Sequence, residues 1–196
     1  LVDKDGAAQS EIRIGKRALP FDATGEYYRA QLMNFVLGDA FNSRININLR
    51  EDKGYTYGAR TGFSGNDIGG VFTARTGVRT DVTRESVQEI LSELRNYAAN
   101  GITPAELEFT RSAIGQSDAL NYETPFDKLG FLSSVLTYDL PDNFVDTQNQ
   151  ILATITKSEI DALASKLLPV DEMVAVIVGD RDTILPELEK LDFVII

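Results

Sequence analysis

The sequence contains no cysteine and no histidine. The lack of cysteine excludes disulfides, thiolate nucleophiles and thiolate metal ligands. The lack of histidine excludes the Ser-His-Asp triad, the Cys-His pair and the imidazole ligands that zinc commonly has in enzymes. A metal held by this chain would therefore need ligands that are all oxygen atoms.

Basic residues and long apolar runs are also scarce. The chain has 19 Lys and Arg against 30 Asp and Glu, which gives a formal net charge of −11. Because proteins bind nucleic acids through clustered Lys and Arg, we expect no nucleic-acid partner. The longest apolar run, Met173 to Val178, has the length of a strand and falls short of the ~20 residues that span a bilayer, so we expect no membrane span.

What is present is typical of a globular protein, with 43% hydrophobic and 25% charged residues among 196. This length fits one large domain, and we expect a single domain over residues 1–196. The chain opens on Leu1 in place of Met. We therefore expect it to be a mature or truncated piece, a fragment or half of a larger protein.

The hydrophobic pattern predicts one sheet and several helices. Alternating residues predict a strand at 10–19 and an antiparallel hairpin of strands at 55–63 and 70–78. Helical periodicity, with capping boxes at Thr103 and Thr156 and an N-cap at Thr24, predicts helices at 25–38, 43–51, 83–100, 104–120, 125–138, 143–155 and 157–168.

The two ends complete the predicted fold. Residues 1–8 are expected to be a flexible lead-in, and 173–178 a strand that is buried on both faces or lies under helices. A short helix then leads to a closing apolar segment, 193–196. This order predicts an α+β fold, a two-layer sandwich with a largely antiparallel sheet and helices on one face.

Local motifs for metal or nucleophilic chemistry are weak. Neither an EF-hand loop nor a third ligand accompanies the acidic pairs, so solvated helix faces and turns explain them better. There is no P-loop, no G-x-G-x-x-G and no G-x-S-x-G elbow. The acidic pairs are Glu85 with Glu89, Glu106 with Glu108, and Asp180 with Asp182.

The stretch 42–58 is the strongest candidate for a functional centre. It has the pattern of a helix end, a glycine hinge at Gly54 and the start of a strand, which would bring Arg50 and Tyr57 together. Both side chains donate hydrogen bonds, so the pair suits a peptide carbonyl or the oxyanion that develops on it. The local pattern alone equally allows a surface arginine and an amphipathic strand tyrosine whose side chain shares a face with Tyr55, Ala59, Thr61 and Phe63.

Several segments carry a resemblance to a known family. Leu-Gly-Asp-Ala-Phe-Asn-Ser-Arg (37–44) and Leu-Arg-Glu-Asp-Lys-Gly-Tyr-Thr-Tyr (49–57) resemble the signature of the C-terminal half of the M16 metallopeptidases. This family includes pitrilysin, insulin-degrading enzyme and mitochondrial processing peptidase. Further similar segments, in the order of the family, are 9–15, 26–28, 34–38, 100–108 and 176–180.

The resemblance implies a domain of the LuxS/MPP-like metallohydrolase type. Active members carry His-x-x-Glu-His in the other half, which binds zinc and supplies the general base, and this chain has no histidine. The resemblance therefore implies no cofactor in this chain, zinc in a partner domain or subunit, and a peptide substrate. It maps the Arg and Tyr that reach the zinc site from the opposite half onto Arg50 and Tyr57, as substrate-binding residues that assist catalysis.

We expect such a chain to be part of a bacterial zinc metalloendopeptidase and inactive in proteolysis by itself. Two other functions stay open at this stage, a non-catalytic scaffolding paralogue and a peptide-binding module that uses a strand edge. A homodimer of the isolated domain is a further expected partner state. The sequence leaves the compartment, periplasm or cytoplasm, undecided.

Overall fold

The computed structural model describes residues 1–117 and 123–192. Five strands form one sheet in the order β1-β5-β2-β4-β3. The short β1 pairs parallel with β5, and the other neighbours are all antiparallel. The strands are β1 (Val2–Asp3), β2 (Gln9–Ala18), β3 (Thr56–Gly65), β4 (Gly70–Arg79) and β5 (Val174–Gly179).

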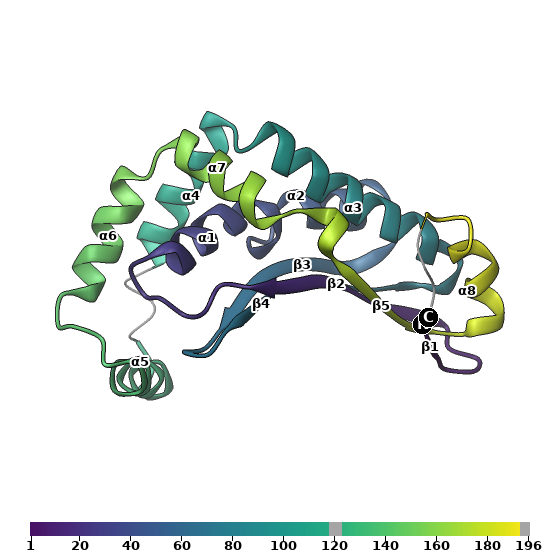
Figure 1. Ribbon diagram of the computed structural model, residues 1–196, viewed down its shortest axis with the longest axis horizontal. Coiled ribbons are helices and arrows are strands. Elements are labelled where there is room, and N and C mark those ends of the chain that lie inside the picture. The colour runs from purple at the N-terminus through teal and green to yellow at the C-terminus, as the bar shows by residue number, and fades with distance from the viewer. Residues whose placement is uncertain (118–122, 193–196) are drawn as a thin grey trace.

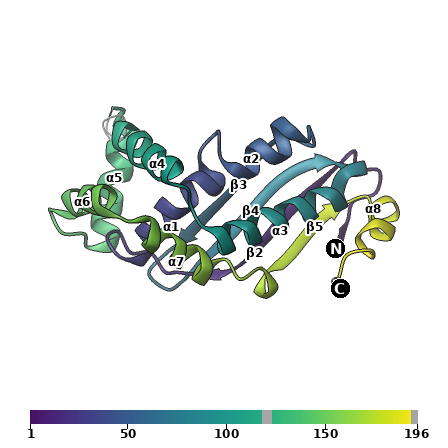
Figure 2. The same cartoon turned by 90° about the horizontal axis from the view of Figure 1, so that it is seen from above.

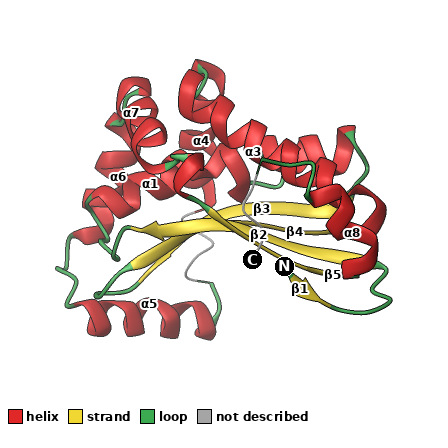
Figure 3. Cartoon of the chain, turned by 45° about the vertical axis from the view of Figure 1, so that its right-hand side comes forward, coloured by secondary structure: helices red, strands yellow, loops and turns green. Residues whose placement is uncertain are grey.

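A layer of helices covers one face of this sheet (Figure 1; from above in Figure 2). One helix, α5, lies apart from this layer, below the level of the sheet (Figure 3). The predicted α+β sandwich is confirmed. The helices are α1 (Glu26–Asn34), α2 (Arg44–Asn46), α3 (Thr83–Asn100), α4 (Pro104–Ser117), α5 (Pro125–Tyr138), α6 (Phe144–Thr154), α7 (Lys157–Leu167) and α8 (Arg181–Leu188), with π-helical turns η1 (Phe35–Asp39) and η2 (Ile47–Asp52) and 3-10 turns η3 (Thr80–Val82) and η5 (Val170–Glu172).

The alternation of side chains decides which face of the sheet meets the helices. In β2, Ile12 and Ile14 are buried whereas Arg13 between them is exposed. We call the face of the sheet that points away from this helix layer the open face. In β5, Val174 and Val176 lie on the open face and are 68% and 45% exposed. This strand therefore lies under helices on one side only, and burial on both faces, one of the two readings for 173–178, is wrong.

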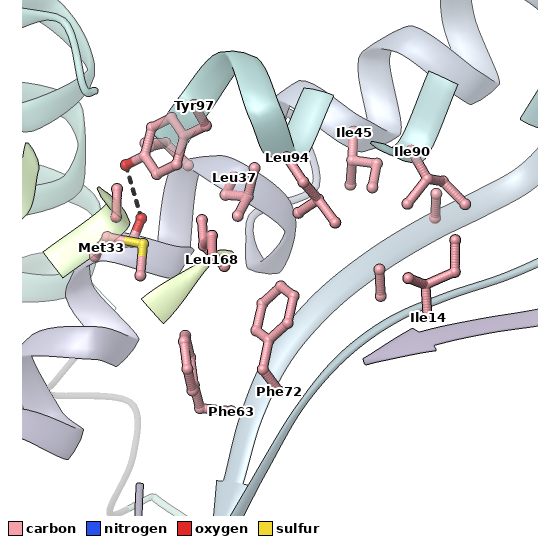
Figure 4. Packing of buried hydrophobic residues seen from close by; sticks show 14 of the residues in the cluster. Ile14, Met33, Leu37, Ile45, Phe63, Phe72, Ile90, Leu94, Tyr97 and Leu168 are labelled. Atoms are coloured by element: carbon pink, nitrogen blue, oxygen red, sulfur yellow. Dashed lines mark hydrogen bonds between the residues drawn. The ribbon is translucent and has the colours of Figure 1, made fainter. Parts of the chain in front are cut away.

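The core lies between the sheet and α3. Ile90 and Leu94 of α3 pack above Ile14 and Phe72 of the sheet (Figure 4). Further along α3, the buried Tyr97 donates a hydrogen bond of 2.9 Å to the carbonyl oxygen of Met33. Burial of these apolar side chains is the main driving force for joining the two layers.

Two local predictions are wrong. Residues 1–8 include β1, and Lys4 N–H donates to the carbonyl of Gly179 at 2.8 Å, because β5 has backbone groups there that need partners. Thr24 does not cap α1. The carboxylate of Asp22 accepts hydrogen bonds from the N–H groups of Thr24 and Gly25 instead.

Other boundaries agree with the predictions or lie outside the described residues. The capping boxes at Thr103 and Thr156 are both formed. The predicted end of the helix that starts at Pro104 and the closing segment 193–196 are not among the described residues. None of the helices in the described part of the chain is both long and apolar enough to cross a membrane.

Candidate functional site

Arg50 lies on the π-helical turn η2, where sequence patterning predicted ordinary helix. The wider turn is closed by a hydrogen bond of 3.0 Å from Lys53 N–H to the carbonyl of Asn48. Gly54 then adopts φ 63°, a left-handed conformation that glycine takes without steric cost, and the chain turns into β3. The predicted glycine hinge is present, and π-helical turns are frequent at functional sites.

The guanidinium of Arg50 is held from one side. Its central carbon lies 4.7 Å from the ring centroid of Phe41, and its Nε lies 3.5 Å from a carboxylate oxygen of Glu51. The Arg50 side chain is 33% exposed and Phe41 is 64% exposed. Stacking on an aromatic ring uses the flat face of a guanidinium and leaves its N–H groups in the plane available to a ligand.

Tyr57 is presented by a β-bulge. Thr56 pairs with Val78 and Ala59 pairs with Thr76, so three steps along β3 match two along β4. The extra residue shifts Tyr57 away from the face of Ala59, and Tyr57 is 92% exposed. The prediction that it shares a face with Ala59, Thr61 and Phe63 is wrong, because that prediction assumed unbroken alternation.

One buried amide connects the surroundings of Arg50 and Tyr57. Asn46 is 2% exposed and donates a hydrogen bond of 2.6 Å to the carbonyl of Phe41, the residue under Arg50. Its side-chain oxygen accepts a hydrogen bond of 2.9 Å from Ala59 N–H, next to the bulge of Tyr57. The two candidate side chains are therefore mounted on backbone segments that share a single side-chain clamp.

Neither Phe41 nor Asn46 was singled out by sequence reasoning. Asn46 precedes Arg50 by four residues and lies on the same side of the helical segment, which is the one available cue. Its role depends on partners 5 and 13 residues away, and no local pattern encodes those distances. Phe41 lies within the stretch 37–44 that carries the resemblance.

Helix side chains also cover the outer edge of β3, the long edge strand of the sheet. Asn46 occupies the N–H of Ala59, Asn34 donates to the carbonyl of Thr61 at 2.9 Å, and Tyr27 donates to the carbonyl of Phe63 at 3.2 Å. These groups are the ones that an added strand would use. The edge from 59 to 63 is therefore poorly suited to strand addition by a peptide.

The most strongly coupled charges lie elsewhere. Arg44 makes a two-pronged ion pair with Glu106, with both N–O distances 2.6 Å, and stacks 4.6 Å from the ring of Tyr97. Burial alone would raise the pKa of Glu106, but its hydrogen bonds with Arg44 and Thr103 outweigh burial and lower it. This pair ties α2 to the start of α4, so its role is structural.

The acidic pairs are also accounted for by structural contacts. Asp180 accepts hydrogen bonds from Thr183 N–H and Gly6 N–H at the start of α8, and Glu89 pairs with Lys53 at 2.9 Å. Within residues 1–117 and 123–192, no three carboxylates gather closely enough to hold a metal ion. With no histidine or cysteine in the sequence, the residues of this chain do not fit a zinc site.

Comparisons with known proteins bear on the family and the fold of this chain. A family model described as the peptidase M16 inactive domain matches residues 1–114. The chain is 30% identical over 129 residues to YmxG, an uncharacterized zinc protease of Bacillus subtilis (strain 168), across 66% of this chain and 31% of YmxG. Because the chain covers only 31% of YmxG, the likeness concerns one part of that protein.

Two solved structures have the same fold. The peptidase M16 inactive domain from Pseudomonas fluorescens matches with a TM-score of 0.82 and 23% identity, over 91% of this chain and 42% of that one. A protease from Helicobacter pylori matches with a TM-score of 0.81 and 20% identity, over the same shares. The chain thus spans less than half the length of each of these relatives.

Proposed function

Because the chain belongs to the family of the peptidase M16 inactive domain, we propose that it is the zinc-free half of a zinc metallopeptidase. In this proposal the zinc and the general base are carried by another domain or subunit. This chain contributes Arg50 and Tyr57 to that site. In this proposal it does not hydrolyse peptides alone, because its sequence has no histidine or cysteine and no three carboxylates gather into a metal site within residues 1–117 and 123–192.

The proposed roles follow from the chemistry of the two side chains. The Arg50 guanidinium can donate two N–H groups to a peptide carbonyl. The Tyr57 phenol can donate one hydrogen bond to the oxygen that becomes negative when the carbonyl carbon is attacked. Together they hold the substrate backbone and stabilise the tetrahedral intermediate.

The observation that carries the proposal is the shared clamp of Asn46. Its two hydrogen bonds tie the carbonyl of Phe41 and the N–H of Ala59 to one side chain, and this link between the backbone segments that carry the two donors supports the proposal that they are pre-organised. Donors that are pre-organised in this way need little reorganisation during the reaction. Both side chains are also accessible, at 33% and 92% exposure.

The test requires this chain together with the zinc-bearing domain or subunit of the same protein. We expect Arg50→Ala and Tyr57→Phe each to lower kcat/KM by roughly tenfold to a thousandfold, the range for losing one donor to an oxyanion. Matched controls are Arg95→Ala, on the exposed face of α3, and Tyr55→Phe, two residues from Tyr57. Turnover that is unchanged in both test variants would refute the proposed roles and favour a scaffolding paralogue.

Zinc binding by this chain alone is a second test. We expect titration calorimetry to detect no tight one-to-one zinc binding, and a fluorogenic peptide to remain uncut after zinc is added. A clear one-to-one isotherm would contradict the assignment of zinc to another domain or subunit.

The rival function, a peptide-binding module that uses a strand edge, is disfavoured, because the edge of β3 is already occupied by Asn46, Asn34 and Tyr27.

A further inference from the structure

Three arginines lie side by side across the open face of the sheet. Arg75 of β4 stands directly opposite Arg13 of β2 on one side and directly opposite Arg60 of β3 on the other. Directly paired residues in antiparallel strands project on the same face, with Cβ atoms ~5 Å apart. The three residues therefore form a row of about 10 Å across three strands, which we call the arginine row.

Most of this positive charge has no partner among residues 1–117 and 123–192. Arg13 and Arg75 are exposed, and neither guanidinium makes a hydrogen bond or ion pair with any residue in the described part of the chain. Arg60 donates a hydrogen bond to the backbone carbonyl of Asp39, which leaves its charge in place. Like charges directly opposite each other destabilise a sheet, so folding does not explain the row.

The row lines a hollow that is large enough for a ligand. A cavity of about 640 Å³ has all three arginines in its wall, together with Ser64 and Thr73. Asp39 also lines it. Cavities of this size accept several side chains or a small molecule.

The charge of this face is opposite to that of the whole chain. The net charge is −11, yet the residues of β2, β3 and β4 whose side chains alternate onto the open face include Arg17 as well as the arginine row, and one acid, Glu11. Arg79 lies on the same face, and its charge is paired with Asp81 at 3.1 Å. A basic hollow within an acidic protein attracts anions to one place on its surface. The ligand that complements it carries more than one negative charge along ~10 Å.

We propose that the arginine row binds acidic side chains of an extended peptide. Each guanidinium can bind one carboxylate by donating two parallel hydrogen bonds to it. An extended peptide covers ~10 Å in about three residues, so acidic side chains at nearby positions reach successive arginines. The identification of this peptide as a substrate rests on the proposed function, whereas the binding itself does not.

Binding can be measured with this chain alone, by the fluorescence anisotropy of a labelled hexaglutamate peptide at low salt. We expect Arg75→Gln to weaken binding by tenfold or more, because it removes the central bidentate partner, and Arg13→Gln to weaken it similarly. Arg95→Gln and Arg181→Gln are matched controls that remove the same charge from helices away from this face, and both should bind as wild type. Charge reversal in Arg75→Glu should weaken hexaglutamate binding further than Arg75→Gln does, because it lowers the charge of the row from +3 to +1 and places a carboxylate between Arg13 and Arg60.

Several outcomes would overturn the proposal. These are no hexaglutamate binding by the wild type, equal losses in the test and control variants, or competition by inorganic phosphate as effective as that by the peptide. The last result would identify a small-anion site. The binding test uses Arg13, Arg75 and the two control residues, none of which has a proposed catalytic role, so failure of the arginine row and failure of the proposed catalytic role give different results.

Discussion

Replacement of Asn46 by alanine tests the link between the two candidate donors. The substitution removes the hydrogen bonds to the carbonyl of Phe41 and from the N–H of Ala59. Ala59 is 1% exposed, so its N–H would be left without water or another partner, at a cost of about 1–3 kcal/mol. Loss of the bond to the more accessible Phe41 carbonyl costs about 1 kcal/mol.

The expected net change follows from these contributions. Alanine favours the helical segment over asparagine by about 0.5 kcal/mol, which offsets part of the loss. We therefore expect Asn46→Ala to lower the free energy of unfolding by about 2–3 kcal/mol. Asn46→Asp keeps the acceptor for Ala59 N–H, but it replaces the donor to Phe41 with a buried carboxylate oxygen that faces the carbonyl oxygen. It should therefore cost at least as much as Asn46→Ala.

Urea unfolding followed by far-ultraviolet circular dichroism measures these differences. Asn149→Ala is a matched control, since Asn149 is an exposed helical asparagine on α6. A difference below ~0.5 kcal/mol between Asn46→Ala and this control would refute the reasoning about the clamp.

The same variant has a functional readout that a purely structural role would not produce. Asn46 does not reach the surface, so in our proposal it acts only by positioning Arg50 and Tyr57. With the zinc-bearing partner, at a temperature where the variant is fully folded, we expect kcat to fall by tenfold or more because small misplacements of donors are costly. A normal kcat in a folded, destabilised variant would show that the clamp serves stability alone.

Three further predictions concern stability. The ion pair with Arg44 lowers the pKa of Glu106. The ~1–3 kcal/mol that this pair contributes to the free energy of unfolding is therefore present above about pH 4.3, and it is lost as the pH falls through the lower folded-state pKa. Arg44→Met should flatten this part of a plot of unfolding free energy against pH, and an unchanged slope would contradict the prediction. Arg75→Thr should raise the free energy of unfolding by ~0.5–1 kcal/mol, since it removes like-charge repulsion in the sheet, even though it weakens acidic-peptide binding; a loss of stability in urea would count against the row as a strained feature. Gly38→Ala should lower the free energy of unfolding by ~1–3 kcal/mol, because the added Cβ would overlap the hydroxyl and backbone nitrogen of Thr61 and push η1 away from β3. A melting temperature equal to that of the wild type would refute this close contact.

The sequence alone determined most of the elements and their order, with the short β1 and the π-helical turns as exceptions. The apolar stripe of α3, the capping boxes at Thr103 and Thr156, and the alternation in β2 are local patterns, and each formed as predicted. These patterns span a few residues, so hydrogen bonding and burial within one element are enough to fix them. The absence of histidine and cysteine likewise decided from composition that a zinc site does not fit this chain.

Tertiary structure alone decided how side chains from distant elements combine. The bulge that exposes Tyr57 depends on the register between β3 and β4, which a single sequence does not encode locally. The clamp of Asn46 and the cover over the β3 edge require helices to approach a strand that follows them in the chain. Arg13, Arg60 and Arg75 are ordinary surface residues in the sequence, and only strand pairing brings their charges together, because neighbours in a sheet are set by hydrogen-bond register and not by chain distance.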